Sequence, residues 1–150
     1  MSEKGTLRQD ERVLAALAHG SILLGVLTNG IGGIGTALVI WLTQKERSAY
    51  ATYQSLQALV YQVVAFIVAF LAWAFWGVLW MLMLLPPIFA NPQAYEKAPP
   101  AGLWVGLVLM FVPIAISGLT ILYGLWGAAR CLSGHDFRYA IIGRWLEKQK

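Results

Sequence analysis

Every charged residue of this 150-residue chain falls in one of four short patches. The stretches between the patches, residues 13–44, 48–95 and 98–129, contain no Asp, Glu, Lys or Arg and are rich in aliphatic and aromatic side chains. A water-soluble domain needs charge across its surface, because much of that surface faces water. Lipid is the solvent that suits this pattern, so the chain is predicted to be a multi-span helical membrane protein of one domain.

The first uncharged stretch predicts a helical hairpin over residues 13–43. A Thr-Asn-Gly turn at residues 28–30 divides it into two apolar pieces, Val13–Leu27 and Ile34–Leu42. Each piece is shorter than the roughly 20 residues that a perpendicular span requires. Two arrangements stay open, since the pieces either just cross the membrane or form a re-entrant hairpin. Both return the chain to the side from which it started.

The second uncharged stretch predicts a long third span over residues 54–85. The pair Pro86-Pro87 is expected to end this helix, because proline cannot continue one. Residues 86–101 then form a proline-containing loop that is polar enough to lie in water.

The third uncharged stretch predicts a fourth span over residues 102–131, kinked at Pro113. The predicted fold is therefore all-α, with four transmembrane helices of which the first two are short and the last two long.

The basic residues predict the orientation. In a four-span chain one side carries residues 1–12, the turn at 45–47 and the C-terminal tail, which together hold ten of the eleven Lys and Arg residues. The other side carries only Lys97. Cytoplasmic segments are enriched in Lys and Arg, so we expect a multi-pass protein of the cell inner membrane with both termini cytoplasmic and loop 86–101 outside. The protein is therefore expected to contact the lipid bilayer. We expect no nucleic-acid partner, because no nucleic-acid recognition module accompanies the basic residues.

Residues 134–150 predict an amphipathic helix on the inner membrane surface. Its apolar face comprises Phe137, Ile141, Ile142, Trp145 and Leu146. Packing of this helix on the protein's own spans fits the same pattern, and the two interpretations are compatible.

Several short patterns resemble chemical motifs without their required context. Residues 30–35 match G-x-G-x-x-G, but a dinucleotide site needs a βαβ unit around it. Cys131, His135 and Asp136 lie close together, whereas a structural zinc site usually needs four ligands in paired spacing. No carboxylate lies inside a predicted span, which argues against a proton-coupled carrier. We predict no enzyme, no cofactor and no metal site, and expect Cys131 to be a small apolar residue at a helix end, with palmitoylation as the alternative.

One helical face at the start of the third span is unusually polar. It comprises Tyr50, Tyr53, Gln54, Gln57 and Tyr61. Glutamine is costly in lipid, so this face is expected to turn inward. The favoured interpretation is that it binds the first hairpin, with His19 as a partner. The other interpretation is a face that contacts a substrate.

Five short motifs occur in an order that resembles a known family. They are Asp10-Glu11-Arg12 followed by Leu17-Ala18-His19, Ile40-Trp41-Leu42 with Lys45 behind it, Gln57-Ala58-Leu59, and Gly134 with Phe137-Arg138-Tyr139. Over residues 10–146 the chain resembles a bacterial membrane domain of unknown function related to the Tic-twenty-like subunits of the chloroplast inner-envelope import machinery. It departs from that pattern at Gln54, where relatives often have His, and at Ala140, where they often have Pro.

The resemblance implies a four-helix membrane fold with both ends inside. The candidate interaction or structural polar residues are Glu11, Arg12, His19, Gln54, Gln57, Arg138 and Tyr139. The predicted function is that of a non-enzymatic membrane protein acting through protein contacts, as an accessory subunit of a larger membrane complex or in translocation or assembly of membrane proteins. The alternative is a small transporter or channel with a polar path near His19, Gln54 and Gln57.

Overall fold

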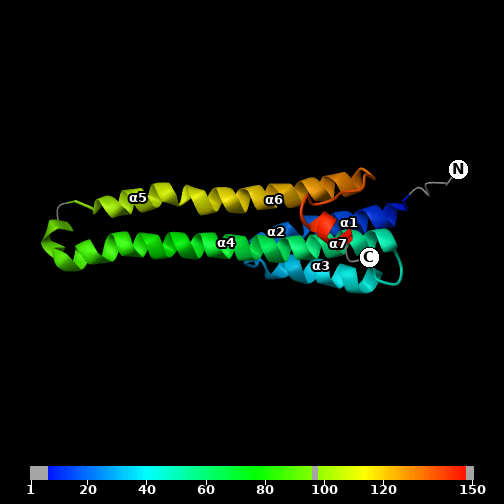
Figure 1. The fold of residues 1–150 in the computed structure, drawn as a ribbon, viewed down its shortest axis with the longest axis horizontal. Helices are drawn as coiled ribbons and strands as arrows, with labels where there is room; N and C mark the ends of the chain where they lie inside the picture. Colours follow the sequence, from blue (N-terminus) through cyan, green and yellow to red (C-terminus); the bar gives the residue numbers. More distant parts are fainter. Residues whose placement is uncertain (1–6, 96–97, 148–150) are drawn as a thin grey trace. The chain divides into compact units, whose positions relative to one another are not determined.

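The computed structural model describes residues 7–95 and 98–147, which form helices and connections without a strand. Figure 1 shows these elements in chain order. They are α1 (Gln9–Gly20), α2 (Ile22–Leu27), α3 (Ile31–Gln44), α4 (Ala49–Ala90), the 3-10 turn η1 (Pro92–Tyr95), α5 (Ala101–Leu109), α6 (Phe111–Leu132) and α7 (Ile142–Glu147). The all-α prediction is confirmed for this part of the chain. Residues 1–6, the charged pair Glu96-Lys97 and the last three residues of the predicted tail lie outside the described residues.

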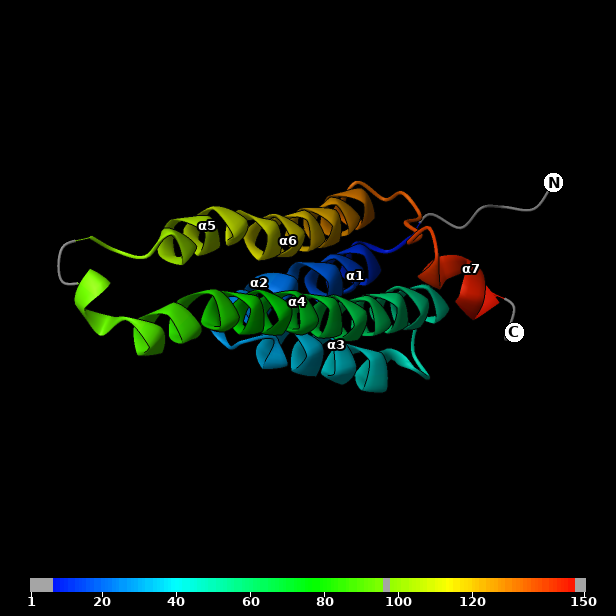
Figure 2. The ribbon, with the colours of Figure 1, turned by 60° about the vertical axis from the view of Figure 1, so that its left-hand side comes forward.

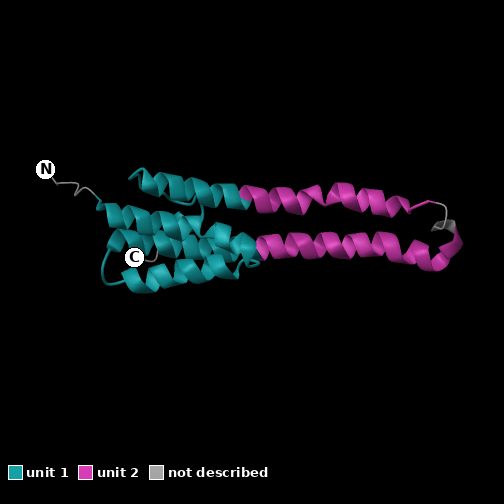
Figure 3. Ribbon diagram, turned by 180° about the vertical axis from the view of Figure 1, so that it is seen from behind, with its two compact units in different colours: residues 1–66, 120–150 teal, residues 67–119 magenta. Residues whose placement is uncertain are grey.

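The chain divides into two compact units (Figure 3). Unit 1 comprises residues 1–66 and 120–150, and unit 2 comprises residues 67–119. The first part of α4 and the last part of α6 belong to unit 1, and the remainder of both helices belongs to unit 2.

Unit 1 packs α1, α2 and α3 beside the first part of α4 (Figure 2). Its buried apolar positions are dominated by alanine: Ala15, Ala16, Ala18, Ala37, Ala51, Ala58 and Ala65. Small side chains let helix backbones approach closely, which is the usual basis of helix association in lipid. Larger apolar side chains of the same helices, among them Leu17, Leu23 and Val39, are exposed. This distribution suits a surface that faces lipid and not water.

Two segments are long and apolar enough to cross a membrane: α4, and α5 together with α6 over Ala101–Leu132. Only 6% and 11% of their most apolar windows are buried. A core helix of a soluble protein would instead be mostly buried, so the exposure favours membrane spans. Two of the four predicted spans thus have the required helices. α1, α2 and α3, of 12, 6 and 14 residues, are each too short to do so alone, and crossing by the first hairpin stays a prediction.

The prediction that Pro86-Pro87 ends the third helix was wrong, because α4 continues to Ala90. Proline removes one helical N–H donor, but the turn that follows is still closed by the Asn91 N–H, which donates to the Pro87 carbonyl at 3.0 Å. The Met83 carbonyl, four residues before Pro87, loses its helical donor and is met by Gly102 of α5. A Cβ atom on Gly102 would lie 2.7 Å from that oxygen, so the position needs glycine.

The predicted kink in the last span agrees with a break between α5 and α6 at Met110. Pro113 occupies the first turn of α6, where a missing N–H is tolerated.

Unit 2 is a helical hairpin that turns indole N–H groups inward. The Trp76 Nε1–H donates to the Gly106 carbonyl at 2.9 Å, and the Trp73 Nε1–H donates to the Ser117 hydroxyl at 3.3 Å. These bonds give the indole N–H groups an acceptor, which the lipid hydrocarbon could not provide.

The amphipathic helix predicted over residues 134–150 is not confirmed. α7 begins only at Ile142, and residues 135–139 have no regular secondary structure. Phe137 and Leu146 are buried in the protein, whereas Ile141 and Trp145 are exposed. The described part of the tail therefore packs on the protein's own helices.

Candidate functional site

A buried polar cluster joins α1, α4 and the segment before α7 in unit 1. His19 of α1 is 1% exposed. Its Nδ1 lies 3.0 Å from the Tyr139 hydroxyl, and its Nε2 lies 3.1 Å from Oε1 of Gln54 on α4. These two contacts connect residues that are 120 and 35 positions from His19 along the chain.

The other contacts of Gln54 fix the direction of these bonds. Its amide nitrogen donates to the Asp136 carboxylate at 2.8 Å and to the Phe137 carbonyl at 3.1 Å. The Gln54 oxygen must then face His19, so Nε2 of His19 carries the hydrogen and Nδ1 accepts from the Tyr139 hydroxyl. Burial raises the pKa of Tyr139, which keeps its hydroxyl protonated as this bond requires.

Gln57, one turn further along α4, binds the backbone of the same segment. Its Nε2–H donates to the Phe137 carbonyl at 3.2 Å, and its Oε1 accepts from the Tyr139 N–H at 3.2 Å. The side-chain amide of Gln57 thus donates to one backbone group and accepts from another, as a neighbouring strand does in a β-sheet. The Phe137 carbonyl and the Tyr139 N–H thereby have partners although residues 135–139 do not form a helix. We call residues 135–139 the strap.

Aromatic rings pack around the strap. The Tyr139 ring is stacked on Tyr61 with centroids 4.1 Å apart, and Phe137 meets the His19 ring edge-on at 5.4 Å. Gly127 of α6 makes room for both: a Cβ atom there would lie 2.8 Å from the Phe137 ring and 3.2 Å from Nδ1 of His19. The strap is thus held by α1, α4 and α6 together.

A second polar contact joins α4 to the helices of the first hairpin. The Gln62 amide nitrogen donates to the Ala18 carbonyl at 2.9 Å and lies 3.1 Å from the Ser21 hydroxyl. Gly33 of α3 packs against them, and a Cβ atom there would lie 2.5 Å from the Gln62 oxygen. Sequence reasoning missed Gln62 as a site residue, although its spacing from Gln54 and Gln57 in a charge-free helix was the available signal.

Glu11 and Arg12 lie apart from the cluster. The Glu11 carboxylate accepts from the Ser48 hydroxyl at 2.8 Å and from the Arg8 N–H at 3.0 Å. These bonds, that of Ser48 first, lower the pKa of Glu11. The Arg12 guanidinium packs against Gly134, whose φ of +74° favours glycine.

Of the seven candidate residues, the structure brings four into one cluster: His19, Gln54, Gln57 and Tyr139. Arg138 touches its edge through an exposed ion pair with Asp136 at 3.1 Å. Cys131 is fully buried in the same core. Within residues 7–95 and 98–147, no three His, Cys, Asp or Glu side chains gather as a metal site would require.

A family model for magnetosome magnetite crystal formation proteins (MamF/MmsF) matches residues 10–146. The chain belongs to this magnetosome family. Comparisons with curated proteins and with solved structures gave no match. The resemblance to the Tic-twenty-like family was wrong. It depended on motifs of one to three residues, which are too short to distinguish one family from another.

Membership in the magnetosome family also bears on the class of function. The family is one of crystal-formation proteins and is not a known family of enzymes. Together with the two long apolar helices, it makes this chain a membrane-associated protein of the magnetosome type.

Proposed function

We propose that this chain is a non-enzymatic integral membrane protein that takes part in magnetite crystal formation through contacts with other membrane proteins. It would serve as an accessory subunit of a larger assembly or help such an assembly form. The observation that carries the proposal is the family match, which spans residues 10–146.

The buried cluster supports a structural role for the most unusual polar residues. His19, Gln54 and Gln57 are at most 1% exposed, and each donates or accepts within the protein. A water-filled path needs polar groups that face a lumen, whereas these face one another and the strap. This geometry favours a protein that works through its outer surface over the transporter or channel.

The proposal keeps the predicted topology, with four crossings and both termini on the cytoplasmic side. The distribution of Lys and Arg supports it. A reporter fused after Lys150 would test it, and a periplasmic signal would overturn the orientation without touching the proposed role in crystal formation.

The role in crystal formation can be tested in a magnetosome-forming bacterium whose own family protein has been deleted. We expect expression of this chain to restore the crystal dimensions measured by electron microscopy. The variant Gln57→Leu, which removes two hydrogen bonds to the strap, should restore them less well than Gln93→Ala, which alters an exposed glutamine. Unchanged crystals in cells that insert the wild-type chain normally would contradict the proposal.

Action through protein contacts needs a separate measurement. Purification in mild detergent followed by mass spectrometry should recover other magnetosome membrane proteins with the chain. Recovery of the monomer alone, under conditions that preserve known membrane complexes, would contradict this part.

A further inference from the structure

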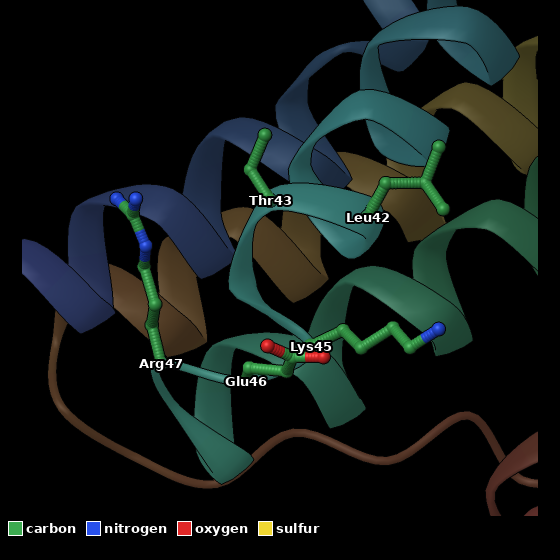
Figure 4. A pocket seen from close by; sticks show the side chains of 5 residues that line it. All are labelled: Leu42, Thr43, Lys45, Glu46 and Arg47. Atoms are coloured by element: carbon green, nitrogen blue, oxygen red, sulfur yellow. The ribbon is translucent and has the colours of Figure 1, made fainter.

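A hollow of about 440 Å³ lies at the turn between α3 and α4, lined by Leu42, Thr43, Lys45, Glu46 and Arg47. Figure 4 shows that the side chains of Lys45 and Arg47 point away from each other. These two cations cannot bind one ligand group together, so we assign no ligand to the hollow.

The strap and α7 divide an apolar face that the sequence places on one helix. Phe137, Ile141 and Trp145 follow one another at four-residue spacing, so they would share one side of a continuous helix. In the structure Phe137 is 6% exposed, whereas Ile141 is 80% exposed and Trp145 is 52% exposed. The extended strap therefore turns one part of this face into the core and leaves the other part outside it.

α7 could extend toward the N-terminus across the strap without a new helix nucleus. The Gly143 N–H already donates to the Tyr139 carbonyl at 2.9 Å, which is a bond of helical spacing. Adding residues to an existing helix costs far less than starting one. Residues 135–141 contain neither proline nor glycine, and Asp136 is of a residue type preferred at the N-cap. A helix that begins at Phe137 is thus compatible with this segment.

The glutamines of α4 occupy the backbone groups that such a helix would use. The Phe137 carbonyl accepts from Gln54 at 3.1 Å and from Gln57 at 3.2 Å, whereas in a helix it would accept from the Ile141 N–H. The Tyr139 N–H donates to Gln57 at 3.2 Å, whereas in a helix it would face the N-cap side chain. Gln57 therefore competes with the helix for one donor and one acceptor of the strap.

We propose that the tail is a two-state switch, in which the clamped strap exchanges with a continuous helix over residues 137–147. The clamped state predominates, because it buries two aromatic side chains of the strap and includes the bonds from both glutamines. In the helical state Phe137 leaves the core and joins Ile141 and Trp145 on one exposed face. The proposal is independent of the role in crystal formation.

The test is nuclear magnetic resonance of the full chain in detergent micelles, with ¹³C at the Cα atoms of Phe and Tyr. Cα chemical shifts distinguish an extended backbone from a helical one. In Gln57→Leu we expect the Cα signals of Phe137 and Tyr139 to move from extended to helical values. Gln93→Leu makes the same change at an exposed glutamine and should leave both signals in place.

Ala140→Pro supplies the second control. Proline inside the helix removes an N–H and disfavours a helical backbone at the residue before it, so adding this change to Gln57→Leu should abolish the helical values. In the clamped state the Ala140 N–H donates to the Tyr123 hydroxyl at 3.3 Å, and this exposed bond is the one that the substitution removes among the contacts described.

Three results in these variants would overturn the proposal. Random-coil values at Phe137 and Tyr139 in Gln57→Leu would show a strap that merely unfolds, and unchanged extended values would show one that stays clamped. Helical values that survive Ala140→Pro would show that the shifts do not report this helix.

The wild-type chain provides a measurement that does not require Gln57→Leu to fold. Chemical exchange saturation transfer should reveal a minor state with a helical Cα shift at Tyr139, and Ala140→Pro alone should remove it. Absence of this minor state from the wild-type chain would overturn the proposal.

Discussion

The side-chain oxygen of Gln57 lies 3.2 Å from the backbone nitrogen of Tyr139, 82 residues further along the chain. The same side chain donates to the carbonyl of Phe137, so one glutamine binds two backbone groups of the strap. This pairing connects the tail to the longest helix of the protein.

Replacing Gln57 by Leu should destabilise the protein strongly. It leaves the buried Tyr139 N–H without its partner, which costs about 1–3 kcal/mol. It also removes one of the two donors to the Phe137 carbonyl, which keeps its hydrogen bond from Gln54. Thermal unfolding in detergent should show the loss. Gln93→Ala changes an exposed glutamine and should leave the unfolding midpoint in place. Equal midpoints for the two variants would mean that the strap contributes little to stability.

His19 and Tyr139 should be energetically coupled. Tyr139→Phe removes the hydroxyl that donates to Nδ1 of His19 and should cost about 1–3 kcal/mol. Combined with His19→Leu, it should cost less than the sum of the single changes, with a coupling of about 0.5–3 kcal/mol. A double-mutant cycle measured by unfolding gives this value. Additive effects would contradict the hydrogen bond.

Two glycines of α6 should respond to alanine in opposite directions. Gly127→Ala places a methyl group 2.8 Å from the Phe137 ring, and overpacking of this kind costs about 1–3 kcal/mol. Gly118→Ala meets nothing within 4 Å and should stabilise the helix by about 0.5–1 kcal/mol. An unfolding midpoint that does not fall in Gly127→Ala would show that Phe137 does not pack against α6.

Glu11 should make stability depend on pH at the acidic end. Its pKa is lower in the folded protein than its ordinary value, so its ionised form favours folding. That contribution is present above the ordinary pKa and is lost as the pH falls through the folded pKa. Wild type should therefore unfold at a higher temperature than Glu11→Gln near neutral pH, and the difference should fade in acid.

Ser48→Ala supplies the matched comparison for Glu11. It removes the bond that contributes most to the lowered pKa and should weaken the pH dependence. A gap between wild type and Glu11→Gln that persists at low pH would contradict this account of the carboxylate.

The fold could be predicted where hydropathy decides it. The charge-free stretches indicated α4 and the α5–α6 segment, because only lipid suits such runs. The end of α4 could not be predicted from Pro86-Pro87, since a proline near a helix end costs little once the next turn closes on its carbonyl. The start of the helix in the tail could not be predicted for a different reason. Its apolar spacing indicated a helix, but Gln54 and Gln57, some 80 residues earlier, bind its backbone first.

The cost of placing glutamine in lipid predicted part of the candidate site, but it did not predict every residue that these glutamines contact. The expense of glutamine in lipid indicated that Gln54 and Gln57 turn inward, with His19 beside Gln54 as the structure has it. Asp136 gave no such signal, because a carboxylate in a charged tail is normally solvated. Its contact with Gln54 depends on how the strap packs in the core, and this packing cannot be predicted from the local sequence around Asp136.

The polar residues of α1 and α4 hold the strap in the core of unit 1. Amide hydrogen exchange at Tyr139 in the unmodified protein tests it most directly, because this N–H lies outside regular secondary structure and is bonded to Gln57 alone among the contacts described. We predict exchange far slower than in a free peptide, and a marked acceleration in Gln57→Leu. Exchange at the free-peptide rate in the wild-type protein would contradict the claim.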